Sequence, residues 1–83
     1  MSNTGGRRTH TNEERKLADE IGKRIRLLRY QKHLSIFRLS EMLDTSTTTI
    51  SGWEIGGHFP SSQSVIRLAE IFGVTTDYIL KGK

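Results

Sequence analysis

Residues 34–56, LSIFRLSEMLDTSTTTISGWEIG, decide the fold of this chain, because two short helical patterns stand there on either side of a polar turn. Apolar side chains recur at three- and four-residue spacing, which places them on one face of a helix. The first pattern contains Ile36, Leu39 and Leu43, and the second contains Thr49, Ile50 and Trp53. The stretch therefore predicts two short helices, each with one side buried.

A polar joint of only three residues, Asp44-Thr45-Ser46, separates the two patterns. Ser35 and Ser46 stand where a short hydroxyl side chain can accept hydrogen bonds from the first turn of a helix. These positions predict helices over 36–43 and 47–54. Two helices joined by so short a turn are typical of a helix-turn-helix, whose second helix enters the major groove of DNA.

The second helix has an outward face opposite its apolar side. This face holds only small residues: Thr47, Thr48, Ser51 and Gly52. A surface helix without a role more often carries Lys, Glu, Arg or Ala, which favour helix formation. We interpret the small polar face as a contact surface, and the alternative is an ordinary solvated face.

Three further helices are expected, over 12–32, 62–72 and 76–80. Thr11 and Glu14 form a capping box before the first, while Ser61 and Thr75 can cap the other two. The core-facing stripe of the first helix is predicted to hold Leu17, Ile21, Ile25 and Leu28. Gly22 within it suggests a close approach of another helix. His33 and Asp44 stand at helix ends, where a left-handed residue is common.

The composition excludes several classes of protein. The chain has 83 residues and no cysteine, which leaves room for one domain and excludes disulfides and thiolate metal sites. We find no signal peptide and no apolar run long enough to span a membrane, so we expect a cytoplasmic protein. No spacing of His, Asp or Glu resembles a metal site, and no motif indicates a cofactor or an enzyme.

The net charge of +4 indicates an anionic partner, and the basic residues gather in the first part of the chain. Nine of the thirteen precede His33: Arg7, Arg8, Arg15, Lys16, Lys23, Arg24, Arg26, Arg29 and Lys32. Residues 1–11 lack apolar periodicity and are predicted to form a flexible basic arm, with the folded domain over 12–83. The arm either reaches DNA or has no role.

From Ile21 to Leu80 the chain resembles the phage repressor and Cro family of DNA-binding domains, the Xre-type regulators. The matching segments are IGKRIRLLR, LSEML, ISGWEIG and VIRLAEIFGVTTDYIL. The resemblance implies an all-α, five-helix bundle with a helix-turn-helix. It also implies a set of base-facing residues: Ser46, Thr47, Thr48, Ser51 and Gly52. We expect contacts to phosphates, from the domain or the arm, at Arg7, Arg8, Arg24, Ile36, Phe37, Arg38 and His58.

The resemblance further implies an ion pair between Arg29 and Glu54 that ties the first helix to the second helix of the motif. Ile36 and Phe37 depart from the family pattern, which is usually polar there. Ile36 fits a core position as well as a contact. Phe37 fits either a contact surface or an ordinary exposed aromatic.

The second helix of the motif lacks the side chains that make bidentate base contacts, namely Arg, Lys, Asn and Gln. Sequence preference therefore either depends on DNA shape or is low. We predict a sequence-specific regulator of transcription, a repressor acting as a homodimer on a two-fold operator. The alternative is a protein-interaction module, such as an antitoxin-type partner, that binds through Phe37.

Overall fold

The helices predicted from the sequence all form, each within one residue of its expected bounds. The computed structural model describes residues 11–83. Over this range the regular elements are α1 (Asn12–Gln31), α2 (Ile36–Leu43), α3 (Thr47–Glu54), α4 (Ser62–Phe72) and α5 (Thr76–Lys81). No strand occurs in these residues, and the prediction of an all-α, five-helix fold is confirmed. The predicted arm, with Arg7 and Arg8, lies outside the described residues apart from Thr11.

A hydroxyl side chain caps the start of every helix. Each hydroxyl oxygen accepts from the backbone N–H three residues further along, at 2.9–3.1 Å. The five caps are Thr11, Ser35, Ser46, Ser61 and Thr75. Such a cap stabilises a helix by about 0.5–2 kcal/mol, because it satisfies an N–H group that has no partner within the helix. The caps therefore help to fix where these short helices begin.

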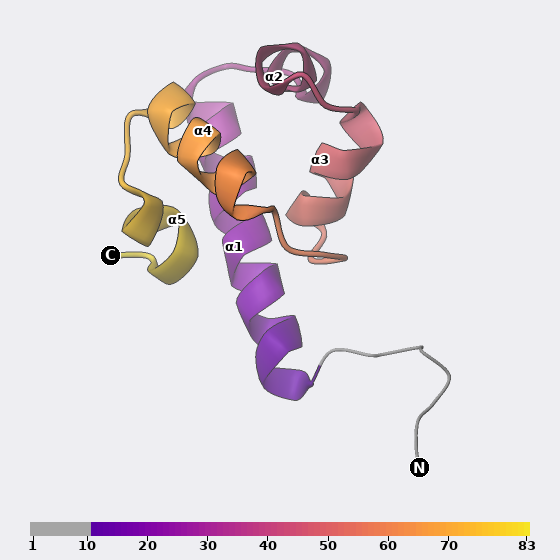
Figure 1. Cartoon of the computed structure of the whole chain (residues 1–83), viewed down its shortest axis with the longest axis vertical. Coiled ribbons are helices and arrows are strands. Elements are labelled where there is room, and N and C mark those ends of the chain that lie inside the picture. Colours follow the sequence, from indigo (N-terminus) through magenta and orange to yellow (C-terminus); the bar gives the residue numbers. More distant parts are fainter. Residues whose placement is uncertain (1–10) are drawn as a thin grey trace.

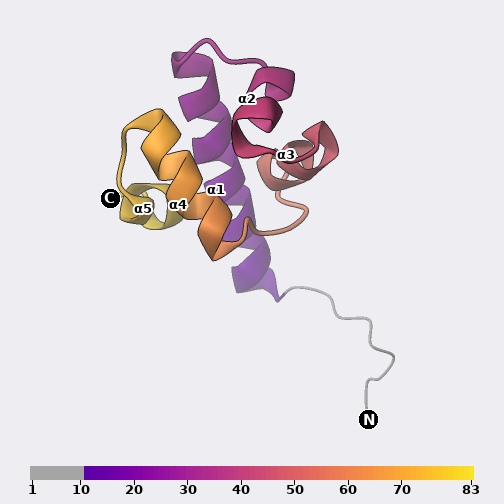
Figure 2. The same cartoon turned by 45° about the horizontal axis from the view of Figure 1, so that its top comes forward.

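The long helix α1 runs through the middle of the fold (Figure 1). Helices α3 and α5 both pack against α1, and the two views place them on opposite sides of it (Figure 2). Helix α2 contacts α3 and α4, and α4 contacts α5. The helix-turn-helix therefore lies on one side of α1 and the C-terminal helix on the other.

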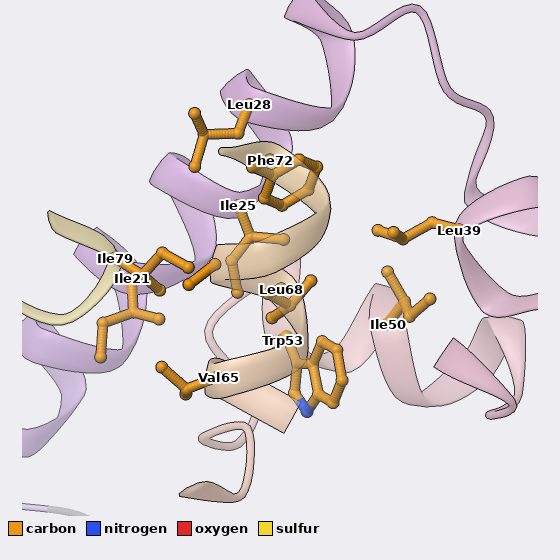
Figure 3. Packing of buried hydrophobic residues seen from close by; sticks show 11 residues of the cluster. Ile21, Ile25, Leu28, Leu39, Ile50, Trp53, Val65, Leu68, Phe72 and Ile79 are labelled. Atoms are coloured by element: carbon orange, nitrogen blue, oxygen red, sulfur yellow. The ribbon is translucent and has the colours of Figure 1, made fainter. Parts of the chain in front are cut away.

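All five helices contribute side chains to one buried cluster (Figure 3). Its members are Ile21, Ile25, Leu28, Leu39, Ile50, Trp53, Val65, Leu68, Ala69, Phe72 and Ile79. Burying one large apolar side chain contributes about 1.5–3 kcal/mol, so this cluster holds the short helices together. Trp53 is only 3% exposed, as its position on the inner face of α3 predicts.

The core-facing stripe of α1 begins one residue later than predicted. Leu17 is 42% exposed, whereas its neighbour Ala18 is 2% exposed. Ala18 lies three residues before Ile21 and four before Gly22, and this spacing continues through the other buried residues of α1. The first turns of α1 also extend beyond the other helices (Figure 1). Leu17 therefore lies at the margin of the core-facing stripe and is only partly covered.

Gly22 lies where α1 approaches the backbone of α3. A Cβ atom at this position would overlap the carbonyl oxygen of Trp53 and would lie 2.9 Å from that of Glu54. Both neighbours are backbone atoms, which cannot rotate away as a side chain can. The close helix approach suggested by the sequence is therefore present, and it depends on the absence of a side chain.

We predict that Gly22→Ala destabilises the protein even though alanine favours helix more than glycine does. Overpacking of this kind costs about 1–3 kcal/mol, because α1 and α3 must separate. Unfolding in urea, followed by circular dichroism, measures the change. Lys23→Ala, at the exposed position next to Gly22, is the control and should change stability by less than about 0.5 kcal/mol. A Gly22→Ala variant as stable as the parent would show that α3 can shift without cost.

Candidate nucleic-acid interface

Helices α2 and α3 are joined by a turn whose backbone is fixed at Asp44. This residue adopts the left-handed conformation, with φ of 55°. The turn is closed by hydrogen bonds from the N–H of Asp44 to the carbonyl of Glu41 and from the N–H of Thr45 to that of Ser40. His33, between α1 and α2, is also left-handed, with φ of 57°. Both predictions of a left-handed residue are confirmed, and the motif has the short joint of a helix-turn-helix.

Helix α3 is divided into a buried side and an outward side. Ile50, Trp53 and Glu54 are buried, whereas Thr47 and Thr48 are exposed and Ser51 is half-buried. The division follows the helical period, because residues three and four apart share a face. The structure thus places the predicted base-facing side chains of α3 on the side of the helix turned away from the core.

Ser46 belongs to the helix cap more than to the outward face. Its hydroxyl accepts from the N–H of Thr49 at 3.0 Å and shares a second hydrogen bond with the hydroxyl of Thr49 at 2.9 Å. A hydroxyl offers one donor and two acceptor positions. Most of this capacity is therefore used within α3.

Gly52 and His58 were predicted for separate contacts, but the structure brings them together. A Cβ atom at Gly52 would overlap the imidazole Nε2 of His58 and would lie 2.8 Å from its Cδ2. The loop is held there by a 2.8 Å hydrogen bond from the N–H of Gly57 to the carbonyl of Gly52. The imidazole therefore fills the place that a side chain at position 52 would take.

A buried ion pair between Arg29 and Glu54 fixes the C-terminal end of α3. Arg29 Nε donates to Glu54 Oε2 at 2.8 Å, and a terminal nitrogen of Arg29 donates to Oε1 at 2.9 Å. Both residues are 6% exposed. Two parallel hydrogen bonds between a guanidinium and a carboxylate set orientation as well as distance. The ion pair implied by the family resemblance is thus present, and it joins α1 to α3.

Three further residues lie next to the Arg29–Glu54 pair. The remaining terminal nitrogen of Arg29 donates to the carbonyl of Leu34 at 2.9 Å, which ties the α1–α2 connection to the same guanidinium. The ring of Tyr30 lies 4.9 Å from the Arg29 guanidinium carbon, and Arg26 approaches Glu54 at 3.8 Å. Hydrogen bonding to Glu54 raises the pKa of Arg29 above its ordinary value, so this residue stays charged.

The N-terminal end of α2 has the partial positive charge of a helix start, and the cationic side chain of Arg38 lies in its first turn. The first turns of α2 and α3 contain no acidic residue, whereas α1 begins with Glu13 and Glu14. The partial positive charge of these two helix ends is therefore not neutralised, which favours an anion such as phosphate. Arg38 pairs with Glu41 only at the exposed surface, at 3.2 Å, and such a pair is easily exchanged.

The two apolar residues at the start of α2 take different positions. Ile36 is partly buried and packs against the core cluster. Its side chain therefore has a core role, and only its backbone N–H is left for a phosphate. Phe37 is 63% exposed, so its ring is available for a contact.

Arg24 was predicted to contact phosphate, and the structure gives it a different role. Its Nε donates to the carbonyl of Ile79 at 2.8 Å, and a terminal nitrogen donates to that of Leu80 at 3.0 Å. Arg24 therefore holds the end of α5, on the side of α1 away from α3 (Figure 1). The sequence does not show this role, because carbonyl groups at the end of a helix need donors and no local pattern reveals which distant arginine supplies them.

Sequence reasoning missed one link that supports the motif. A terminal nitrogen of Arg67, on α4, donates to the carbonyl of Met42 near the end of α2 at 2.9 Å. The two residues are 25 positions apart, and no local pattern connects them.

Within residues 11–83 no group of His, Asp and Glu could hold a metal ion, and no helix there has the length and hydropathy needed to cross a bilayer.

Comparison with known proteins gives consistent matches. A family model described as a helix-turn-helix domain matches residues 22–83. The HTH-type transcriptional activator BcrR of Enterococcus faecalis is 36% identical over 64 residues, which are 77% of this chain and 31% of the relative. The SPbeta prophage-derived uncharacterized HTH-type transcriptional regulator YonR of Bacillus subtilis strain 168 is 33% identical over 62 residues, 75% of this chain and 57% of the relative. The chain thus spans about a third and just over half of these two proteins.

Solved structures share the fold. The P22 c2 repressor, in complex with synthetic operator 9T, superposes with a TM-score of 0.72 at 30% identity, over 76% of this chain and 96% of the repressor chain. The DNA-binding domain of S. venezulae BldD superposes with a TM-score of 0.68 at 24% identity, over 78% of this chain and 97% of that chain. The second likeness concerns the fold alone.

We predict that Glu54→Gln strongly destabilises the protein, because it leaves the buried charge of Arg29 without a partner. Breaking a buried ion pair from one side costs about 3 kcal/mol, whereas loss of an exposed pair costs under about 1 kcal/mol. The free energy of unfolding in urea measures the difference. Glu70→Gln, at an exposed position on α4, is the matched control. Equal effects of the two substitutions would contradict a structural role for the pair.

Proposed function

Because the chain belongs to the helix-turn-helix domain family, we propose that it is a transcriptional regulator that binds double-stranded DNA, with α3 in the major groove. The observation that carries the proposal is the division of α3. Its buried side is fixed by the core and by the Arg29–Glu54 pair, and its outward side presents short polar groups. A helix held so rigidly can approach base edges without rearrangement.

In this proposal Thr47, Thr48 and Ser51 face the bases. A threonine hydroxyl can donate to or accept from a base edge, and its methyl group can contact the methyl of thymine. Neither contact distinguishes bases as well as the bidentate contact of a longer side chain. We therefore propose that direct readout is limited and that DNA shape contributes to sequence preference.

Phosphate contacts in this proposal come from the helix ends and from exposed cations. The backbone N–H groups at the starts of α2 and α3 would bind phosphates, with Arg38 beside them. Such contacts position the protein on the duplex without reading its sequence. Arg24 is left out of this set, because its guanidinium is bonded to α5.

We also propose that the protein binds as a homodimer, because two copies of one motif match the two halves of a palindromic site. The role is that of a repressor in the cytoplasm, where the protein would have access to DNA. We propose no catalytic activity. The family and the fold are those of DNA-binding regulators.

A protein partner bound through Phe37 is a second candidate function, since an aromatic side chain 63% exposed is suited to an apolar contact. The two functions respond differently to salt. Contacts to phosphates weaken steeply as salt concentration rises, whereas an apolar contact centred on Phe37 does not.

Selection of bound fragments from a random duplex pool, at two salt concentrations, tests the main proposal. Enrichment of one palindromic sequence, with weaker recovery at the higher salt, is the expected result. Recovery of DNA without enrichment of any sequence would contradict sequence-specific binding. No recovery at either salt would contradict DNA binding altogether and would favour the protein-partner function.

We predict that Thr48→Ala and Ser51→Ala each weaken binding to the selected duplex and relax its sequence preference. Loss of one hydrogen bond costs about 0.5–1.5 kcal/mol, equivalent to roughly a two- to tenfold rise in Kd. Titration of labelled duplex, with fluorescence anisotropy, measures the change. Thr76→Ala, on α5, is the control and should leave Kd unchanged. If neither substitution alters affinity or preference, the outward face of α3 does not contact the bases.

We predict that deletion of residues 1–10 weakens binding to every duplex to the same degree and flattens the salt dependence. Each phosphate contact contributes about 0.9 to the slope of log K against log salt, so Arg7 and Arg8 together account for up to about two units. The melting temperature should hardly change, because the core cluster lies between residues 21 and 79. Replacing both arginines with Gln in the full chain removes the charge of the arm but keeps its length, so it shows which of the two matters. Unchanged affinity at low salt in both variants would show that the arm has no role.

A further inference from the structure

We propose that His58 reads a base edge in the major groove, acting as the side chain that Gly52 lacks, and this inference rests on the proposed function. The sequence offered no reason to join these two residues, and His58 was expected to contact phosphate. The structure places its imidazole against Gly52 on the second helix of the motif. A residue of the following loop would thereby complete the reading surface of α3.

The position of the imidazole follows from the geometry of α3. Residues 48 and 52 are one helical turn apart, so Thr48 and Gly52 are neighbours along one edge of the outward face. A Cβ atom at Gly52 would overlap Nε2 of His58, and the ring atoms Cδ2 and Cε1 lie 2.8 and 3.2 Å from that position. The ring of His58 therefore lies beside Gly52 on the outward face of α3, one helical turn after Thr48.

The loop is attached to α3 by its backbone. The N–H of Gly57 donates to the carbonyl of Gly52 at 2.8 Å, so the residue immediately before His58 is fixed to the residue on which the ring lies. His58 itself is exposed. The Nε2 end of the ring thus lies against Gly52, and the exposed remainder of the side chain is left for a partner.

The imidazole of His58 adds a ring nitrogen to an outward face of α3 that otherwise presents only hydroxyl groups. Hydroxyl groups are the only polar side-chain groups that Thr47, Thr48 and Ser51 present. An imidazole has two ring nitrogens, and because Nε2 lies against Gly52, Nδ1 is the nitrogen left to donate a hydrogen bond to DNA. The acceptors available to such a donor in the major groove are N7 of both purines, O6 of guanine and O4 of thymine. We assign His58 a purine as its partner, because both purines present N7, whereas cytosine presents only a donor and thymine a single acceptor beside its methyl group.

A contact to phosphate would have a different effect on binding. A residue that contacts phosphate adds affinity for all sequences and steepens the salt dependence, whereas a residue that reads a base changes the preference at one position of the site. The two roles can therefore be separated by measurement with the same variant.

The experiment compares four proteins in selection from a random duplex pool, followed by titration of the selected duplex and of a scrambled one. They are the parent chain, His58→Ala, Gly52→Ala and the double variant. Gly52→Ala keeps the histidine but displaces its ring from α3. Melting temperatures, and the nuclear magnetic resonance signals of the ring protons of His58, show whether each variant is folded and whether the ring has moved.

We expect the parent to prefer a purine at one position of each half-site, and His58→Ala to lose that preference while retaining the others. Its Kd for the selected duplex should rise about three- to tenfold, with little change for the scrambled duplex or for the salt slope. Gly52→Ala should shift the ring signals and lose the same preference. The double variant should be no worse than either single variant, because both remove one contact.

Three results would overturn the inference while leaving the proposed function in place. The first is an unchanged preference in His58→Ala. The second is a uniform loss of affinity with a flatter salt slope, which would make His58 a phosphate contact. The third is additive losses in the double variant, which would mean that the Cβ at position 52 hinders DNA directly. A parent chain that enriches no sequence would overturn both this inference and the proposed function.

Discussion

The orientation of α3 depends on the ion pair between Arg29 and Glu54. The pair is buried, bidentate and further bonded to the carbonyl of Leu34, so one guanidinium joins α1, the α1–α2 connection and the end of α3. Removing two charges from water is costly, and a buried ion pair often adds little net stability compared with apolar residues of the same size. The pair instead fixes the orientation of α3 relative to α1, because a planar guanidinium and a planar carboxylate can form two parallel hydrogen bonds in few arrangements.

The ion pair acts together with the close approach at Gly22. Without a side chain at this position, α1 reaches the backbone of Trp53 and Glu54, which brings the carboxylate within reach of Arg29. The opposite end of α3 is held by the Ser46 cap and by packing of Ile50 in the core. Each end of an eight-residue helix thus has its own attachment, and a helix so short would not be stable in isolation.

The sequence predicts the helices well because their signals are local. A capping hydroxyl, an apolar repeat of three and four residues, and a left-handed end residue all act within one or two turns. The wrong assignment of Leu17 arises because a repeat defines a stripe but does not show where the partner helices end. The bonds of Arg24 to α5 were missed for a related reason. A basic residue suggests phosphate, whereas the carbonyl groups of Ile79 and Leu80 that Arg24 contacts lie 55 and 56 residues away.

The relation of His58 to Gly52 could not be inferred from the sequence, because what matters is an absent side chain and a loop that folds back over it. The Arg29–Glu54 pair was expected only because the family resemblance implied it. Nothing in the chemistry of either residue alone selects the other. Local physics thus accounts for the elements, whereas contacts between distant residues require the fold.

The two sides of α3 are subject to different constraints. Replacing Ile50, Trp53 or Glu54 would disturb the core or leave a buried charge, so the inner side is tied to the fold. The outer side contributes no residue to the buried core cluster, so its residues can change while the fold persists. This division is consistent with a fold shared with the P22 c2 repressor at a TM-score of 0.72 and only 30% identity. A common scaffold therefore carries no information about which DNA sequence is bound, and that property has to be sought in the outward residues and in the loop that lies beside them.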